Sequence, residues 1–346
     1  MKRLDTFKLR HFLGFLLILL IGMLISLVIG SVSIPIKEVF NIILSKIQEK
    51  LSLGEVISSP HASIILAVRL PRVINASLVG ASLAISGAAM QGLLRNPLAE
   101  GGTLGVSSGA GLGAVLAIAL GISIPGFPFG ATVIMAMAFA FLSILIILTL
   151  SYKLDFNLST NTIILLGVIF SMFVSSIQSF IIVFSSNRLE SIMSWSMGSL
   201  SGSSYSGGLI ILIVLLIAGI NIYSKSRELD AFAISEENAA HIGVDVRKIK
   251  LSIMVSVSAL IGVSVAFSGT IGFVGLIIPH IMRRIVGPSH RKLIIATGFG
   301  GGIFLLIADL IARTVMAPLE LPIGIITSFV GSILFINIYY SLRKVR

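Results

Sequence analysis

The 346-residue sequence contains no cysteine and few charged residues. The absence of thiols excludes disulfides, cysteine nucleophiles and cysteine-ligated metal sites. Charged residues make up 11% of the chain, whereas a typical soluble domain has roughly 25%. The hydrophobic share is 56% and the mean hydropathy is +1.08. This composition excludes a soluble globular fold and indicates an integral membrane protein.

Signatures of catalysis are also missing. The five histidines form no HExxH pattern, and no GxxxxGK[ST] phosphate loop occurs, so we do not expect the chain itself to hydrolyse nucleotide by that route. The serines within 201–206 have no partner base and indicate a polar turn. We therefore expect no catalytic residue, no metal site and no cofactor, and an intramembrane enzyme is the weakest functional hypothesis.

Apolar runs recur along the whole chain, and crossing a bilayer takes about 20 such residues. The run 271–285 is short and contains Pro279, and only a Gly269/Gly272 break separates it from the run before. The hydropathy pattern predicts one all-α integral membrane domain, 1–346, with ten transmembrane helices. The predicted spans are 11–33, 62–92, 104–121, 127–151, 160–184, 206–223, 247–268, 271–285, 291–314 and 322–343.

Basic residues are distributed unevenly between the two sides that this topology defines. Ten spans put both termini on one side, and most of the 25 Lys and Arg residues fall in loops and span ends on that side. By the positive-inside rule, that side is cytoplasmic. We therefore expect a multi-pass protein of the plasma (inner) membrane with cytoplasmic termini. The same distribution explains the net charge of +11 and removes the motive for a nucleic-acid partner.

Two further patterns concern the loops and the packing. Residues 34–61 are predicted to form an extracytoplasmic loop with an amphipathic segment, 36–51. Small residues four apart allow helix backbones to approach closely in lipid, so their recurrence predicts a compact bundle. These pairs are Gly80/Ala84, Gly105/Gly109, Gly109/Gly113 and Gly298/Gly302.

The largest predicted cytoplasmic loop, 224–250, contains the signals of a short helix. Ser235 is a candidate N-cap, and Glu236 and Glu237 would occupy the first turn, where the helix dipole favours acids. Gly243 is a candidate stop. From the residues alone, a surface helix and an ordinary solvated loop are equally good interpretations. The helix would expose Ala239, Ala240 and Ile242.

Asp309 is the only acid deep within a predicted span. An intramembrane carboxylate is costly and is by default a functional hypothesis. Arg313 follows four residues later, which is the spacing of an ion pair on a helix. We favour a local Asp309–Arg313 pair. The alternative is a proton relay, which would make the protein a proton-coupled secondary transporter.

Arg69, Arg72 and Arg313 share the predicted extracytoplasmic edge, against the positive-inside trend. Two interpretations are open at this point. The side chains could snorkel to the membrane surface, or they could form a cationic rim that captures acidic groups on a partner.

Six segments, in order, resemble the permease subunits of ATP-binding-cassette (ABC) importers for iron–siderophores, haem and vitamin B12, the type II importers. The resemblance covers nearly the whole chain from residue 69 onward. One departure is Gly101-Gly102, where the family commonly has a proline nearby. The matching segments are RLPR (69–72), GASLAISGAAMQGLLRNPLAEGGTLGVSSGAG (80–111), WSMGSLSG (195–202), SEENAAHIGV (235–244), GTIGFVGLIIPHIMRRIVGPSHRKL (269–293) and ADLIARTVMAPLELPIGIITSFVGS (308–332).

The resemblance implies a vitamin B12 importer permease-like bundle with several partners. A second permease, identical or paralogous, would complete the pathway within the membrane lipid. Two separate ATPase subunits would hydrolyse ATP, and an extracytoplasmic substrate-binding protein would deliver an iron chelate (siderophore or haem) or cobalamin. The alternative remains a proton-coupled secondary transporter using Asp309.

The resemblance also implies roles for individual residues. Arg69, Arg72 and Arg313 match arginines that pair with glutamates of the binding protein. The cytoplasmic gate positions are Asn96, Leu98, Thr160 and Asn161, with a serine in place of Asn161 in the vitamin B12 permeases. The matching coupling helix, which docks on the ATPase, comprises Ser235, Glu236, Glu237, Ala239, Ala240, Ile242 and Gly243.

Overall fold

The computed structural model describes residues 9–30, 32–50, 60–125, 130–156 and 158–343, and these residues form helices without a β-strand. The helical elements are α1 (Leu9–Val28), α2 (Ile36–Lys50), α3 (Pro60–Ser63), the π-helical η1 (Ile64–Arg69), α4 (Leu70–Leu93), the 3-10 helix η2 (Gly101–Leu104), α5 (Val106–Leu120), α6 (Gly130–Leu154), α7 (Thr160–Phe184), the 3-10 helix η3 (Ser186–Arg188), α8 (Leu189–Ser196), α9 (Tyr205–Ser224), α10 (Ser226–Phe232), α11 (Glu236–His241), α12 (Val246–Ser268), α13 (Val274–Val286), α14 (His290–Thr314) and α15 (Ile323–Arg343).

Every predicted span corresponds to helix in the structure, and the predicted all-α membrane fold is confirmed. Among the described residues, seven continuous helical stretches are long and apolar enough to cross a membrane: α1, α3 to α4, α6, α7, α9, α12 and α14. The other three predicted spans correspond to α5, α13 and α15, of which α13 has 13 residues. The count of ten spans therefore stays a prediction.

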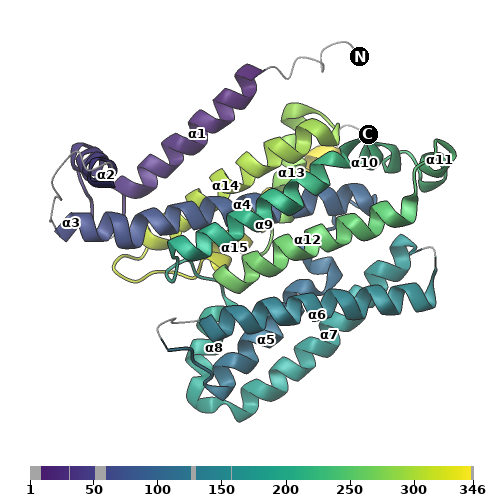
Figure 1. The fold of residues 1–346 in the computed structure, drawn as a ribbon, viewed down its shortest axis with the longest axis horizontal. Helices are drawn as coiled ribbons and strands as arrows, with labels where there is room; N and C mark the ends of the chain where they lie inside the picture. Colours follow the sequence, from purple (N-terminus) through teal and green to yellow (C-terminus); the bar gives the residue numbers. More distant parts are fainter. Residues whose placement is uncertain (1–8, 31, 51–59, 126–129, 157, 344–346) are drawn as a thin grey trace.

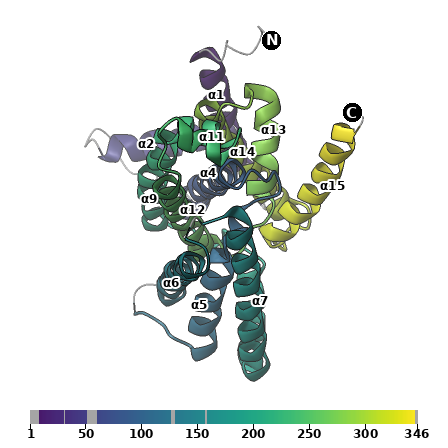
Figure 2. The same cartoon turned by 90° about the vertical axis from the view of Figure 1, so that its right-hand side faces the viewer.

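Helix α4 is the centre of the bundle. Viewed end-on in Figure 2, it is surrounded by α9, α12, α13 and α14, and all four contact it. Pro71 stands at the start of α4, which directly follows the π-helical turn η1. Gly, Ala and Ser make up 11 of its 24 residues, and nearly all its side chains are buried. Helix α4 therefore serves as the shared packing surface for its neighbours.

Glycines set the closest approach between α4 and its neighbours. A Cβ built on Gly80 would lie 2.2 Å from the Gly301 carbonyl oxygen, and one on Gly87 would lie 1.9 Å from that of Gly275. The prediction of close packing at Gly80 and Ala84 is thus confirmed, because a Cβ on Gly301 would also meet the Ala84 Cβ at 2.5 Å.

Helices α5, α6 and α7 form a second group beside this central one (Figure 1). Helix α12 contacts α5 and α6 on one side and α4 and α9 on the other, so it connects the two groups. Helix α15 stands at one edge, next to α13 and α14 (Figure 2).

The breaks after α4 and after α12 meet inside the bundle. Gly269 and Phe273 have positive φ values of 67° and 69°, which ends α12 before α13 begins. The Phe273 backbone N–H donates to the Glu100 carboxylate. A cavity of about 140 Å³ lies between the breaks and includes Glu100 and Thr270 in its lining. Irregular backbone at membrane depth is tolerated where protein or a cavity surrounds it.

The bundle has two ends, which we name by the short helices found there (Figure 1). The α2 end carries α2, α3 and the end of α14, and the α11 end carries α10, α11 and the start of α12. Helix α2 confirms the predicted amphipathic segment as far as Lys50. The predicted loop 224–250 is corrected to two short helices, α10 and α11, between α9 and α12.

Candidate functional site

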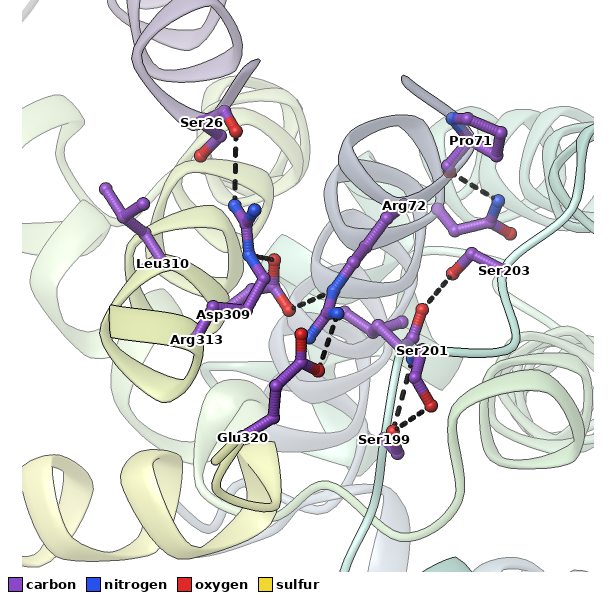
Figure 3. Close-up of polar contacts among 12 residues, drawn as sticks. Ser26, Pro71, Arg72, Ser199, Ser201, Ser203, Asp309, Leu310, Arg313 and Glu320 are labelled. Atoms are coloured by element: carbon purple, nitrogen blue, oxygen red, sulfur yellow. Dashed lines mark hydrogen bonds and ion pairs between the residues drawn. The ribbon is translucent and has the colours of Figure 1, made fainter. Parts of the chain in front are cut away.

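The α2 end contains a buried ionic network, drawn in Figure 3. Arg72 comes from the first turn of α4, and Asp309 and Arg313 come from the last turns of α14. Arg72 Nε donates to Asp309 Oδ1 at 2.9 Å, and Arg313 Nε lies 3.0 Å from Asp309 Oδ2. The predicted Asp309–Arg313 pair is confirmed. Each carboxylate oxygen thus faces a guanidinium group, and one of these comes from a different helix.

Glu320 adds a second carboxylate to this network. Arg72 Nη1 donates to Glu320 Oε2 at 2.8 Å (Figure 3). Glu320 lies in the segment between α14 and α15, and 41% of its side chain is exposed. No sequence pattern pointed to this residue, although it is the acid of the PLELPIG stretch within 308–332, one of the segments that carry the family resemblance. Arg72 therefore lies between a buried and a half-exposed carboxylate.

The other arginine donors bind the C-terminal end of α1. Arg69 Nη1 donates to the carbonyls of Leu27 and Val28 at 2.7 and 3.1 Å, and its Nη2 donates to the carbonyl of Val32. Arg313 Nη2 donates to the Ser26 carbonyl at 3.2 Å. The last carbonyls of a helix have no partner within it. The arginines satisfy them, and α1 accordingly ends at Val28 rather than at the predicted residue 33.

The three arginines lie together at one end, as expected, but they do not form an exposed rim. Their exposed fractions are 3% for Arg69, 6% for Arg72 and 5% for Arg313. A charged side chain is buried only when paired and hydrogen-bonded, and here carboxylates and α1 carbonyls provide the partners. The burial speaks against snorkelling to the membrane surface. A docking role stays a prediction.

The predicted gate residues occupy two segments at the α11 end. Asn96 Oδ1 accepts the Leu98 N–H at 2.9 Å, and this local turn leaves 55% of Leu98 exposed. Thr160 and Asn161 begin α7. The α7 N-terminus is stabilised by Asp155, whose Oδ2 accepts the Ser159 N–H at 2.9 Å.

A cavity of about 550 Å³ brings the gate segments and α11 together. Thr160 and Asn161 line it directly, whereas Asn96 and Leu98 do not and are represented by their neighbours Leu94 and Arg95. The complete lining is Leu94, Arg95, Ser159, Thr160, Asn161, Ser235, Glu236 and Glu237. Three segments that lie far apart in the sequence thus surround one space.

Helix α11 confirms the predicted capped helix. The Asn238 N–H donates to Ser235 Oγ at 2.9 Å, and Gly243 follows the helix with φ of 88°. The exposure of Ala240 and Ile242 is confirmed, and Ile242 is 72% exposed. The prediction that Ala239 is exposed was wrong, because this side chain is fully buried in the core shared by α10 and α12.

Helix α10 is held to the start of α14 by Asp230, another residue that the sequence analysis did not identify. Asp230 Oδ1 accepts the His290 N–H at 2.8 Å and lies 2.6 Å from His290 Nδ1. Burial raises the pKa of the Asp230 carboxyl, but hydrogen bonds from His290 and Ser289 outweigh burial, and the net pKa is below the usual value. An ionised Asp230 therefore suits the helix N-terminus it caps.

Comparison with known proteins agrees with this architecture. The FecCD transport family matches residues 18–342. The chain belongs to this family. FecCD proteins are membrane subunits of transporters, so this permease is a multi-pass protein of the plasma membrane rather than a catalytic subunit. The sequence-based resemblance to ABC importer permeases is thereby confirmed.

Curated relatives of this FecCD permease match over most of their length. An ABC transporter permease of Bacillus subtilis, YvrB, is 39% identical over 92% of this chain and 89% of its own. The hemin transport permease HmuU of Yersinia pestis is 35% identical over 97% of both chains. The vitamin B12 import permease BtuC of Vibrio vulnificus is 35% identical over 83% of this chain and 87% of its own.

A solved structure extends the agreement to three dimensions. It is described as an inward-facing conformation of a metal-chelate type ABC transporter. It superposes with a TM-score of 0.83 at 32% identity, covering 96% of this FecCD permease and all of the other chain.

Proposed function

We propose that this FecCD permease pairs with a second permease to form the pathway through which an ABC importer moves an iron chelate or cobalamin into the cell. The substrate class follows from the relatives, which are named for hemin and vitamin B12, and from the metal-chelate type neighbour.

The observation that carries the proposal is the cavity at the α11 end. Its lining includes Thr160 and Asn161, Leu94 and Arg95 beside the other proposed gate segment, and Ser235 to Glu237 at the start of the helix proposed to contact the ATPase. A transporter driven by a separate ATPase needs its gate within reach of that subunit. In this proposal, ATP binding to two ATPase subunits displaces α11, and the segments around the cavity move with it.

The exposed side of α11 supports an ATPase contact. Ile234 and Ile242 flank the helix and are 74% and 72% exposed, with Ala240 exposed between them. Apolar side chains held out from a short, capped helix suit insertion into a groove of a partner. The α11 end would therefore be cytoplasmic.

The α2 end is proposed to receive the substrate-binding protein. Because the arginines are buried, we expect their positive charge to attract and orient an acidic partner at a distance. Direct contact of all three side chains with the partner is not expected. The accessible part of this surface is the segment after α14, where Leu319 is 70% exposed beside Glu320. Docking would then bring acidic groups of the partner towards Arg72, beside Glu320.

The proton-coupled alternative has little physical support. Asp309 is fully buried with a guanidinium group at each oxygen. Both oxygens are thus engaged by arginines, which is the arrangement of a structural ion pair rather than of a proton relay. Asp309 is better suited to holding α4 and α14 together.

Changing Ala240 to Arg tests the proposed ATPase contact. We expect Ala240→Arg to abolish co-purification of the ATPase because the arginine would enlarge and charge the apolar surface of α11. Capture of the substrate-binding protein, which concerns the opposite end, should persist and should weaken as salt rises. Both can be measured by pull-down of the tagged permease from detergent-solubilised membranes.

Ala240→Ser is the matched control, since it adds only a hydroxyl group and should keep the ATPase bound. ATPase binding by Ala240→Arg at the wild-type level would remove the proposed role of α11. Uptake of radiolabelled ferric siderophore, haemin or cobalamin by cells carrying the wild-type complex would then identify the substrate.

A further inference from the structure

Lys250, on the second turn of α12, is a fully buried cation at the α11 end. Its Nζ donates to the Leu158 carbonyl at 2.8 Å and to Glu236 Oε2 at 2.7 Å. Neither contact is local in sequence. Burying an ammonium group costs several kcal/mol unless it is well paired. An apolar side chain at this position would avoid that cost.

The Glu236 carboxylate connects this cation to α7. Its Oε1 accepts a hydrogen bond from Thr160 Oγ1 at 3.4 Å, while its Oε2 binds Lys250. Thr160 is the first residue of α7 and a proposed gate residue. One side chain of α11 therefore joins the bases of α7 and α12.

The turn that Lys250 holds is itself firmly attached to α12. Arg247, one turn before Lys250, lies over the rings of Tyr152 and Phe156 at 4.4 and 4.3 Å from their centroids. Such cation–π contacts add to the packing. Leu158 is fully buried with φ of 52°. The α6–α7 turn and the base of α12 thus form one unit, to which Glu236 attaches α11.

We propose that Glu236 and Lys250 are positioning residues that transmit a displacement of α11 to the gate end of α7. The linkage rests on the proposed function, because it assumes that the ATPase moves α11 and that α7 contributes to the gate. Asp245 and Lys248 form an exposed ion pair at the start of α12, with Nζ 2.9 Å from Oδ2, and provide a comparison. A displacement of α11 would move Glu236, which contacts Thr160 directly and contacts the Leu158 turn through Lys250.

Single substitutions would confuse transmission with folding. Removing one partner of a buried ion pair leaves the other charge unpaired and is strongly destabilising, whereas replacing both with neutral groups is often tolerated. The informative variant is therefore the double substitution Glu236→Gln with Lys250→Met. It keeps the size of both side chains and removes both charges.

The experiment uses Asn161→Cys as a reporter, because the chain has no other cysteine and Asn161 is exposed. The permease–ATPase complex is purified with and without the double substitution, and maleimide labelling is timed with and without a non-hydrolysable ATP analogue. We expect the analogue to change the labelling rate in the reporter background. In the double variant this change should be lost, while the ATPase stays bound and hydrolyses ATP.

Asp245→Asn with Lys248→Met in the same background removes an exposed ion pair at the start of α12 and should keep the nucleotide response. A double variant that responds to the analogue as the reporter background does would overturn the linkage and leave the ion pair as a structural contact only. A reporter background that ignores the analogue would overturn the gate assignment and the linkage with it. Failure of the proposed ATPase contact is a separate result, in which Ala240→Arg binds the ATPase at the wild-type level.

Discussion

At the scale of single residues, Asp309 determines how the α2 end is built. It is fully buried, and its two oxygens are shared between Arg72 of α4 and Arg313 of α14. The arginines in turn bind carbonyls at the end of α1. Loss of this one carboxylate charge would leave two buried guanidinium groups with reduced compensation.

We therefore expect Asp309→Asn to lower the free energy of unfolding by about 3–5 kcal/mol, which is typical of breaking a buried ion pair. Thermal unfolding of the purified protein in detergent measures the effect, together with the amount recovered from membranes. A wild-type melting temperature in this variant would contradict the anchoring role.

Glu320→Gln is the control for this substitution. It also removes a carboxylate charge from Arg72, but Glu320 is 41% exposed and Arg72 keeps Asp309. Its effect on the free energy of unfolding should be about 1 kcal/mol or less, as for exposed pairs. Equal losses in the two variants would mean that burial does not set the energies of this network.

At the scale of helices, the contact between α4 and α14 depends on glycine. A Cβ on Gly80 would lie 2.2 Å from a backbone oxygen, and backbone cannot rotate away as a side chain does. We expect Gly80→Ala to destabilise the protein by about 1–3 kcal/mol, the usual cost of overpacking, as measured by thermal unfolding in detergent.

Gly14→Ala in α1 is the matched control, since a Cβ there would meet nothing within 4 Å. Alanine also has the higher helix propensity, so this variant should be neutral or slightly more stable. If Gly80→Ala were equally neutral, α4 and α14 would be free to separate, and the close approach would not contribute to stability.

Helix α11 shows what the local sequence can predict about a helix and what it cannot. The N-cap Ser235 and the stop at Gly243 were predicted because both act through their own backbone neighbourhood. Ala239 was assigned to the wrong face, because its burial depends on α10 and α12 packing beside it. The local sequence therefore predicts where the helix begins and ends. It does not predict which side of the helix is buried.

At the scale of the whole molecule, the orientation in the membrane can be tested with cysteines placed in this cysteine-free chain. Lys248 at the α11 end and Leu319 at the α2 end are 83% and 70% exposed. We expect Leu319→Cys, but not Lys248→Cys, to react with a membrane-impermeant maleimide in right-side-out vesicles, because most basic residues should face the cytoplasm.

Labelling of Lys248→Cys should appear once the vesicles are permeabilised, which shows that the position is reactive. The unsubstituted chain should stay unlabelled under both conditions. The reverse pattern would place the α11 end outside the cell and would contradict both the ATPase contact and the docking surface proposed here.

The sequence by itself determined the class of the protein and the positions of its long apolar helices. It also favoured the Asp309–Arg313 pair and offered the capped helix α11 as one of two interpretations. Each depends on neighbours within one or two helical turns, or on the average polarity of about 20 residues. The family, too, is indicated by its motifs alone, because these are short stretches of consecutive residues.

Only the tertiary structure decided which distant groups share an environment. Arg72 and Asp309 are 237 residues apart, and Lys250 and Leu158 are 92 apart. The burial of the arginines, the role of Glu320 and the linkage through Glu236 follow from how whole helices pack. The helical period shows which residues of a helix face the protein interior, but it does not show which other helix packs against them. The identity of that neighbouring helix sets the partners available to each buried charge.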